Sequence, residues 1–503
     1  MVSKFLQIAR PFMSLIPECV KPEREVRFNE KLAWTFGALI VYFLMATIPL
    51  YGVGNLQGEA DPFFWVRTIM ASQRGTLAEL GIGPIVTAGL IMQILTGSKI
   101  INVDMSDPEE RALYTGTQKV LAVAMTIFEA IAYILGGAYP NAVGRTDLSL
   151  LILVQLVAAG ILIILLDELV QKGWGLGSGI SLFIAGGVAQ GIFWNTLSPL
   201  PAVGIGNELE IIGVPATALQ DQTLRHGAIL ALIQAIQAAT AVGANTLEAI
   251  AVLIIRPGNT PGLLSMVTTV ITFLIVIYFE SMRIEIPVSY AKYRGFKGKY
   301  PIKLLYVSNI PVILVSAVFA DAYFVIQMLW NTAGRENAPL LIKLLGNFEA
   351  QGTRYVPLPG CLIYYLTPPQ GIIAVYGDFL RAIVYALVLV GLCIVFSVMW
   401  IETAGMGPRD VSKQLIGAGM QMPGWRQSQK IIEQRLARYI PPTAIIGGIF
   451  IGILAAFADF LGALGTGTGI LLAVSIMRQY FEILVKEKAA DMHPALRDFL
   501  GLM

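Results

Sequence analysis

Residues 80–93, LGIGPIVTAGLIMQ, form a short apolar block with a proline near its start. Proline is tolerated at a helix start because its missing N–H would be unpaired there in any case. A similar pattern, IPVI, opens another apolar block at residues 310–313. GSGI at 177–180 and GTGI at 467–470 form a second matching pair. The two pairs indicate an internal repeat, with chance recurrence of small apolar motifs in a glycine-rich chain as the alternative.

The composition is typical of a polytopic membrane protein. Of the 503 residues, 56% are apolar and 14% are charged, and the mean hydropathy is +0.70. Soluble domains carry roughly 45–50% apolar and about 25% charged residues. The excess of apolar residues excludes a water-soluble enzyme and a disordered chain. Because these residues fall in blocks of about 20, the length that crosses a bilayer, we expect one membrane domain.

Ten apolar blocks have near-spanning length. They lie at about residues 33–52, 82–97, 119–138, 148–167, 178–197, 262–280, 306–329, 379–400, 440–460 and 467–485. Another candidate, residues 227–255, is long enough but is diluted by polar side chains such as Gln234 and Glu248. With ten spans and an inside N-terminus, the inside segments hold 25 Lys and Arg residues and the outside segments hold 9. Cytoplasmic loops carry the positive charge. An additional span at 227–255 would place the later basic loops outside, so we expect this segment to be a helical excursion on the outer side.

Ten spans divide into five and five, and an odd number in each half inverts the second half relative to the first. The expected fold is therefore an all-α polytopic membrane protein with ten transmembrane helices in two inverted five-helix halves and a pathway between them. The expected segments are a cytoplasmic amphipathic N-terminal segment (1–32), the N-terminal half (33–197), an external loop (198–261), the C-terminal half (262–485) and a cytoplasmic tail (486–503).

Few residues are suited to catalysis or metal binding. The only histidines, His226 and His493, lie outside the expected spans, which excludes zinc-protease and Ser–His sites in the membrane. The cysteines Cys19, Cys361 and Cys393 are scattered and indicate neither disulfides nor a metal site. We expect no catalytic residue, no metal and no cofactor.

Three ionisable residues, Glu129, Asp321 and Asp459, lie well within apolar blocks. Such residues are costly in a membrane and are often functional. Asp321 and Asp459 are near the outer ends of their spans, which favours a solvated or hydrogen-bonded structural role, whereas Glu129 is mid-span and remains a functional candidate. A secondary transporter with an inverted repeat is the main alternative at this stage, although a transporter should place more polar groups at the midplane.

Two inside loops, 281–305 and 401–439, are strongly basic. Their cations include Arg283, Lys292, Arg294, Lys297 and Lys299 in the first loop and Arg409, Lys413, Arg426 and Lys430 in the second. Either these charges only fix the topology, or they dock a polyanion such as ribosomal RNA, with Tyr293, Phe296 and Trp425 available for stacking.

Three stretches resemble the SecY/Sec61 alpha family of protein-conducting channels, in its archaeal form. They are residues 80–93, the run from YPIK (300–303) to YVSNIP (306–311), and GALGTGTG at 462–469. The resemblance implies a channel of the cell membrane, without an active site, that passes unfolded polypeptides and releases apolar segments sideways into lipid. Together with the excess of Lys and Arg in the inside segments, we expect both termini to be cytoplasmic.

The resemblance also implies a pore ring, a plug and a lateral gate. The ring corresponds to six aliphatic residues, Ile82, Val86, Ile180, Ile184, Ile310 and Leu472. The internal repeat would favour Ile470 or Val474 over Leu472. The plug corresponds to residues 55–78, whose apolar cluster comprises Phe63, Phe64, Trp65, Ile69 and Met70. The lateral gate lies between spans two and three on one side and seven and eight on the other, bridged by Thr87, Glu129 and Asn309.

The partners implied by the resemblance are the ribosome, signal sequences and nascent polypeptides, the lipid bilayer, and two small membrane subunits. One subunit is SecE/Sec61 gamma-like and the other is Sec beta-like. The two basic loops match the ribosome-docking loops of the family, which favours docking over a purely topological role.

Overall fold

The computed structural model describes most of the chain between residues 10 and 492. Within that range it omits residues 15, 55–69, 99, 102, 104–106, 143, 201–223, 243–245, 255, 257–259, 291–296, 306, 308–309, 335–337, 352–353, 370, 418–419 and 422–428.

The described residues form a helical bundle in which nine helices are long and apolar enough to cross a membrane. They are α2 (Phe28–Thr47), α5 (Pro108–Leu135), α6 (Thr146–Leu169), α7 (Gly179–Leu197), α10 (Leu263–Ser281), α11 (Ile310–Thr332), α15 (Phe379–Thr403), α18 (Ile440–Phe460) and α19 (Gly467–Met492). The second expected span is α4 (Gly83–Gly97), an apolar helix of 15 residues. The predicted fold class of ten membrane helices is confirmed.

Two spans begin earlier than the apolar blocks suggested. Helix α2 begins five residues before the expected span at residue 33 and ends before Ile48, because the following Pro49 disfavours helical geometry in the residue that precedes it. Helix α5 begins at Pro108, eleven residues before the expected start at 119, and the Asp107 side chain accepts the Glu109 N–H at 3.1 Å. Polar helix starts extend beyond the apolar core of a span, so hydropathy alone misses them.

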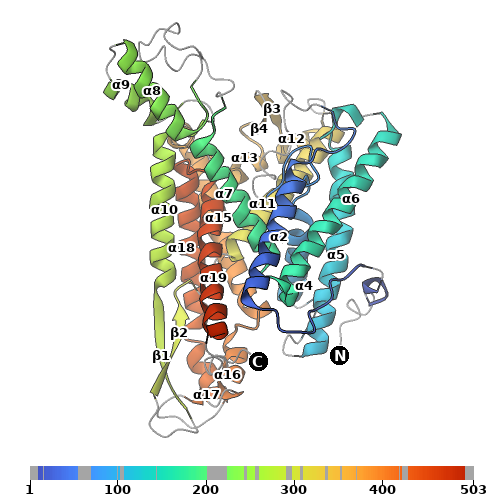
Figure 1. Cartoon of the computed structure of the whole chain (residues 1–503), viewed down its shortest axis with the longest axis vertical. Coiled ribbons are helices and arrows are strands. Elements are labelled where there is room, and N and C mark those ends of the chain that lie inside the picture. Colours follow the sequence, from blue (N-terminus) through green and yellow to red (C-terminus); the bar gives the residue numbers. More distant parts are fainter. Residues whose placement is uncertain are drawn as a thin grey trace.

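The helices α7 and α19 pack against each other in opposite directions near the middle of the bundle (Figure 1). The Tyr480 hydroxyl of α19 donates to the Ser178 carbonyl at the start of α7, at 2.8 Å. At the other end of the contact, a Cβ on Gly469 would lie 3.3 Å from a Val188 methyl. The start of each helix therefore lies against the later part of the other, as expected for equivalent helices of an inverted repeat.

Residues 227–255 form two short helices, α8 (Ala228–Val242) and α9 (Thr246–Ile254), rather than one span. Their contact uses small buried side chains, among them Ala231, Ala235 and Ala239. The pair lies at one end of the bundle, beyond α7 and α10 (Figure 1). The sequence predicted a helical excursion on the outer side, and the structure agrees that this segment is helical.

The two basic loops meet at the opposite end of the bundle (Figure 1). The first forms the antiparallel strands β1 (Arg283–Tyr290) and β2 (Lys297–Lys303), with Arg283 opposite Lys303. The second forms α16 (Pro408–Gly417), β5 (Met420–Gln421) and α17 (Gln429–Leu436), and β5 pairs with β1 at Ser289 and Tyr290. The sheet order is β2-β1-β5, so one sheet joins the two loops.

Shorter elements complete the chain. The connection from α11 to α15 contains α12 (Leu340–Leu345), the hairpin β3 (Phe348–Gln351) and β4 (Arg354–Pro357), α13 (Leu362–Leu366) and α14 (Ile372–Gly377). The one-turn elements η1 (Pro140–Ala142) and η2 (Val170–Trp174) flank α6. A large hydrophobic cluster draws on spanning helices from both halves.

Candidate functional site

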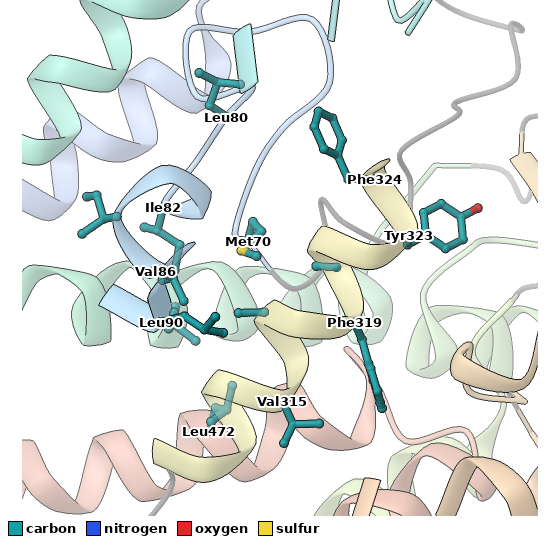
Figure 2. Packing of buried hydrophobic residues seen from close by; sticks show 14 of the residues in the cluster. Met70, Leu80, Ile82, Val86, Leu90, Val315, Phe319, Tyr323, Phe324 and Leu472 are labelled. Atoms are coloured by element: carbon teal, nitrogen blue, oxygen red, sulfur yellow. The ribbon is translucent and has the colours of Figure 1, made fainter. Parts of the chain in front are cut away.

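The six ring candidates lie at the beginnings of four helices. Ile82 immediately precedes α4 and Ile310 is the first residue of α11. The other four, Val86 of α4, Ile180 and Ile184 of α7 and Leu472 of α19, lie within the first two turns of their helices. Ile82, Val86, Ile184 and Leu472 are buried in the large hydrophobic cluster, and Ile180 and Ile310 pack against it half-buried. Figure 2 shows Ile82, Val86 and Leu472 in this cluster.

All six ring candidates have aliphatic side chains, and this determines which chemistry they can support. Aliphatic groups offer no hydrogen bond to a passing peptide and no ligand to an ion. Water and ions that enter such a constriction lose hydration without compensation. The arrangement suits a seal and provides no nucleophile, acid or base.

The described end of the plug segment is bound to the start of α4. Of the plug candidates, Met70 is described and buried, and Phe63, Phe64, Trp65 and Ile69 lie outside the described residues. The Ile82 N–H donates to the Met70 carbonyl at 3.0 Å, and the Tyr42 hydroxyl of α2 donates to the Ala71 carbonyl. Met70 is drawn beside the start of α4 in Figure 2.

Gly81 permits this close approach between the plug segment and α4. Its φ is +55°, in the left-handed region, and a Cβ there would lie 2.2 Å from the Met70 carbonyl oxygen. A side chain at this position would meet both backbone strain and a steric clash. The missing side chain of Gly81 therefore lets the plug segment pack, at Met70, directly against the residues that precede α4.

A polar contact crosses the seam between α4 and α11. The Thr87 hydroxyl donates to Asp321 at 3.1 Å from Oδ1, and Thr87 is 5% exposed. The sequence reasoning did not connect Asp321 with Thr87, because its place near the outer end of a span suggested only a structural role. The sequence left two structural roles open for Asp321, a solvated one and a hydrogen-bonded one, and the bond from Thr87 agrees with the second.

Glu129 of α5 lies beside the start of α4 and is buried. A Cβ on Gly83 would lie 3.0 Å from Glu129 Oε2, so the carboxyl group packs closely against this glycine. Glu129 Oε1 has no hydrogen-bond partner within the described part of the chain. The third gate candidate, Asn309, lies outside the described residues. Thr87 of α4 thus contacts α11 across the seam, and Glu129 of α5 contacts the start of α4.

Further contacts join α5 to α11. The Asn331 side chain of α11 donates to the Gly136 carbonyl at the end of α5, at 2.6 Å. The rings of Tyr133 and Phe324 lie 5.1 Å apart between α5 and α11. Sequence reasoning missed both contacts, since an Asn near a helix end gives no signal of its partner. Between the described residues, contacts therefore cross the seam from α4 and α5 to α11.

The basic residues gather around the three-stranded sheet and the helices beside it. Arg283, Arg409, Lys413 and Lys430 are exposed, and Lys297 and Lys299 lie on β2. Lys292, Arg294 and Arg426 lie outside the described residues. Beneath the loops, a small core that includes Val411, Ile432 and Leu436 packs α16 on α17. The two loops therefore form one surface rather than two.

Comparison with known families identifies the chain. The SecY family model matches residues 76–481, and the model of the plug domain of Sec61p matches residues 40–75. The chain belongs to the SecY family. The two matches meet between residues 75 and 76, between Met70 and Ile82 in the sequence.

Solved structures of SecY-family proteins agree over almost the whole chain. "The structure of a protein conducting channel" is 39% identical, with 97% of this chain and 98% of that chain covered and a TM-score of 0.76. "Sec61 in the Canine ribosome-channel complex from the endoplasmic reticulum" is 38% identical, with the same coverage and a TM-score of 0.74. A third structure, 37% identical with the same coverage and a TM-score of 0.74, concerns the SecY plug domain in the closed channel and its membrane seal.

As a SecY-family protein, the chain is the central channel subunit of a protein translocase. It passes unfolded polypeptides across the membrane and releases hydrophobic segments laterally into the bilayer. The transporter alternative is excluded by the family match over residues 76–481.

Proposed function

We propose that the six aliphatic residues at the starts of α4, α7, α11 and α19 form the seal through which the polypeptide passes. The observation that carries this proposal is that six aliphatic residues from the starts of four helices are buried in, or pack against, the same hydrophobic cluster. An aliphatic ring can adapt its width to an extended chain without binding any particular side chain. A passing chain would replace the contacts that the ring residues make with one another at rest.

The plug segment closes the ring when the channel is idle. The bond from the Ile82 N–H to the Met70 carbonyl ties plug and ring together, so that displacing one disturbs the other. The relation of plug and seal described for the related SecY structure supports this role. A polypeptide that enters between the four helix starts would separate Met70 from Ile82.

The seam between α4 and α5 on one side and α11 and α15 on the other is the lateral gate. Two hydrogen bonds between described residues cross it, from Thr87 to Asp321 and from Asn331 to Gly136. Interhelical hydrogen bonds in membranes contribute about 0.6 kcal/mol each on average. A signal sequence with roughly ten Leu or Ile residues gains about 0.3–0.6 kcal/mol for each on entering lipid. The apolar segment therefore outweighs the polar contacts, and hydrophobicity rather than a specific motif opens the gate.

Ion conductance across planar bilayers tests the seal. The triple variant Ile82→Ser, Ile184→Ser and Ile310→Ser should leak ions, because hydroxyl groups allow water into the constriction. The matched control replaces three lipid-facing residues, Leu150, Leu274 and Leu387, each at least 60% exposed, by Ser. The control should stay as tight as the wild type. A ring variant no leakier than this control would show that the seal lies elsewhere.

The basic surface made by the two loops is proposed to dock the ribosome. Exposed cations on one surface suit a polyanionic partner, and the related Sec61 structure is a ribosome–channel complex. The double charge reversal Arg426→Glu and Lys430→Glu should weaken ribosome binding at physiological salt. The control is Arg145→Glu, an exposed residue next to α6. Ribosome affinity unchanged by the double reversal would reject docking at this surface.

The proposal places this surface, both termini and the other basic segments on the cytoplasmic side of the cell membrane. The excess of Lys and Arg in the inside segments supports this orientation. Reporter proteins fused after residue 503 and within residues 201–223 should report opposite sides. The SecE/Sec61 gamma-like and Sec beta-like subunits should copurify with the chain in mild detergent.

A further inference from the structure

Two buried aspartates occupy equivalent places in the two halves. Asp167 lies near the end of α6 and is 7% exposed. Its Oδ1 accepts the N–H of Ile180, in the first turn of α7, at 2.8 Å. Its Oδ2 accepts the side-chain amide of Gln171 at 2.7 Å. The carboxylate thus joins the end of one spanning helix to the start of the next.

Asp459 repeats this pattern in the second half. It lies near the end of α18 and is 2% exposed. Its Oδ1 accepts the N–H of Gly467, the first residue of α19, at 2.7 Å. Its Oδ2 accepts the hydroxyl of Tyr385, in α15, at 3.0 Å. In both halves one oxygen binds the start of the following helix and the other is held by a side chain.

Glycines take equivalent places around the two caps, although Ser178 is extended, with φ −122°, and its counterpart Thr466 is left-handed, with φ +69°. Each capped helix begins with a glycine whose missing side chain lets it touch the aspartate: a Cβ would lie 2.5 Å from Asp167 Cα at Gly179 and 2.4 Å from Asp459 N at Gly467. Two residues before each of these, a glycine adopts a left-handed conformation, with φ +72° at Gly177 and +79° at Gly465. A side chain at any of these four positions would meet strain or a clash.

This equivalence sets a register that differs from the sequence motifs. GSGI and GTGI align Ile184 with Val474. The helix starts and the left-handed glycines instead align Gly179 with Gly467, and Ile184 and Leu472 then both lie five residues further along their helices. The structural repeat therefore pairs two ring candidates with each other.

We propose that Asp167 and Asp459 are equivalent positioning residues that fix the axial register of α7 and α19, so that Ile184 and Leu472 point into the seal. This inference rests on the proposed ring. A carboxylate that accepts helix-terminal N–H groups favours one start point for the helix, because the first N–H groups otherwise lack partners. Without the cap, a glycine-rich start can slide or unwind, which moves every later side chain around the helix axis.

Cysteine accessibility in full-length channels tests the register. The background carries Ile82→Ser and Ile310→Ser, which should conduct ions, with Cys19, Cys361 and Cys393 replaced by Ser. Single cysteines are then placed at Ile184, Ile470, Leu472 or Val474, and a charged, membrane-impermeant methanethiosulfonate reagent is added. The current should fall for Ile184→Cys and Leu472→Cys. The modification rate at Ile470→Cys and Val474→Cys should be at least about tenfold lower, as for groups turned away from the pore.

The aspartate variants test the positioning role. Loss of a charge-assisted hydrogen bond corresponds to about a tenfold or larger change in a conformational equilibrium. Asp459→Leu should change the modification rate at position 472 by about that factor and leave position 184 unaffected, and Asp167→Leu should do the reverse. Asp→Asn, which keeps one acceptor oxygen, should have a smaller effect. Asp147→Leu, an exposed position in the first turn of α6, should change neither rate.

The possible outcomes separate the inference from the proposed ring. A background that does not conduct would overturn the ring and the inference with it. A conducting background in which Ile470→Cys or Val474→Cys reacts faster than Leu472→Cys would overturn only the register. Equal effects of either aspartate variant on both positions would show general loosening of the fold and would overturn the positioning role.

Discussion

Removing the Thr87 hydroxyl should make the lateral gate easier to open. In Thr87→Val the side chain keeps its shape but loses the donor to Asp321, and the contact at 3.1 Å across the seam disappears. The site is buried, so water replaces the lost bond poorly in the closed state. Thr87→Ser keeps a hydroxyl and is the matched control.

The size of the effect follows from two membrane energy scales. Interhelical hydrogen bonds contribute about 0.6 kcal/mol on average and at most about 1.7 kcal/mol. A leucine that enters lipid contributes up to about 0.6 kcal/mol. With about 0.3–0.6 kcal/mol for each leucine, the hydrophobicity threshold for a signal sequence should fall by about one to two leucines, and by at most about six.

The assay is translocation into vesicles of a graded set of clients whose signal sequences differ by single leucines. The half-maximal leucine number is compared between wild type, Thr87→Val and Thr87→Ser. We expect a lower threshold for the valine variant and the wild-type threshold for the serine variant. A threshold that is unchanged in Thr87→Val, or lowered equally in both variants, would refute the assignment of this hydrogen bond to the gate.

Three further outcomes are expected. Asn331→Leu, which removes the bond to the Gly136 carbonyl, should lower the same threshold by a similar amount, and its effect should add to that of Thr87→Val, as measured with the same clients. Gly81→Ala should destabilise the chain by about 1–3 kcal/mol and raise the idle ion leak, because a Cβ clashes with the plug segment; thermal unfolding and conductance would show this. Leu436→Ala, fully buried beneath the basic loops, should cost about 2–5 kcal/mol locally and weaken ribosome binding while the bilayer stays tight.

The sequence was sufficient for the architecture because the relevant signals are local. Apolar length located the spans, and the end of α18 and the bounds of α7 followed the apolar blocks to within one residue. The starts of α2 and α5 were missed because polar residues continue these helices beyond the apolar core. Asp107, the N-cap of α5, carried that information for α5, whereas Pro49 marked only the end of α2.

The site was only partly predictable because its contacts join distant segments. Asp321 was recognised as an unusual residue, but its partner Thr87 lies on a helix more than 200 positions away in the sequence. The pairing of β5 with β1 joins two basic loops that sequence analysis treated separately. The choice between Leu472 and its neighbours depended on where α19 begins, and a repeated motif cannot reveal a two-residue shift in a helix start.

The most direct test of the central claim is to trap a polypeptide halfway through the channel and ask what it touches. A stalled client with one cysteine would be oxidised against channels with a single cysteine at Ile82, Ile184, Ile310 or Leu472, or at the lipid-facing Leu274. The account predicts disulfides to all four ring positions and none to Leu274→Cys while the chain is in transit. A client that cross-links to Leu274→Cys and to none of the ring positions would contradict it.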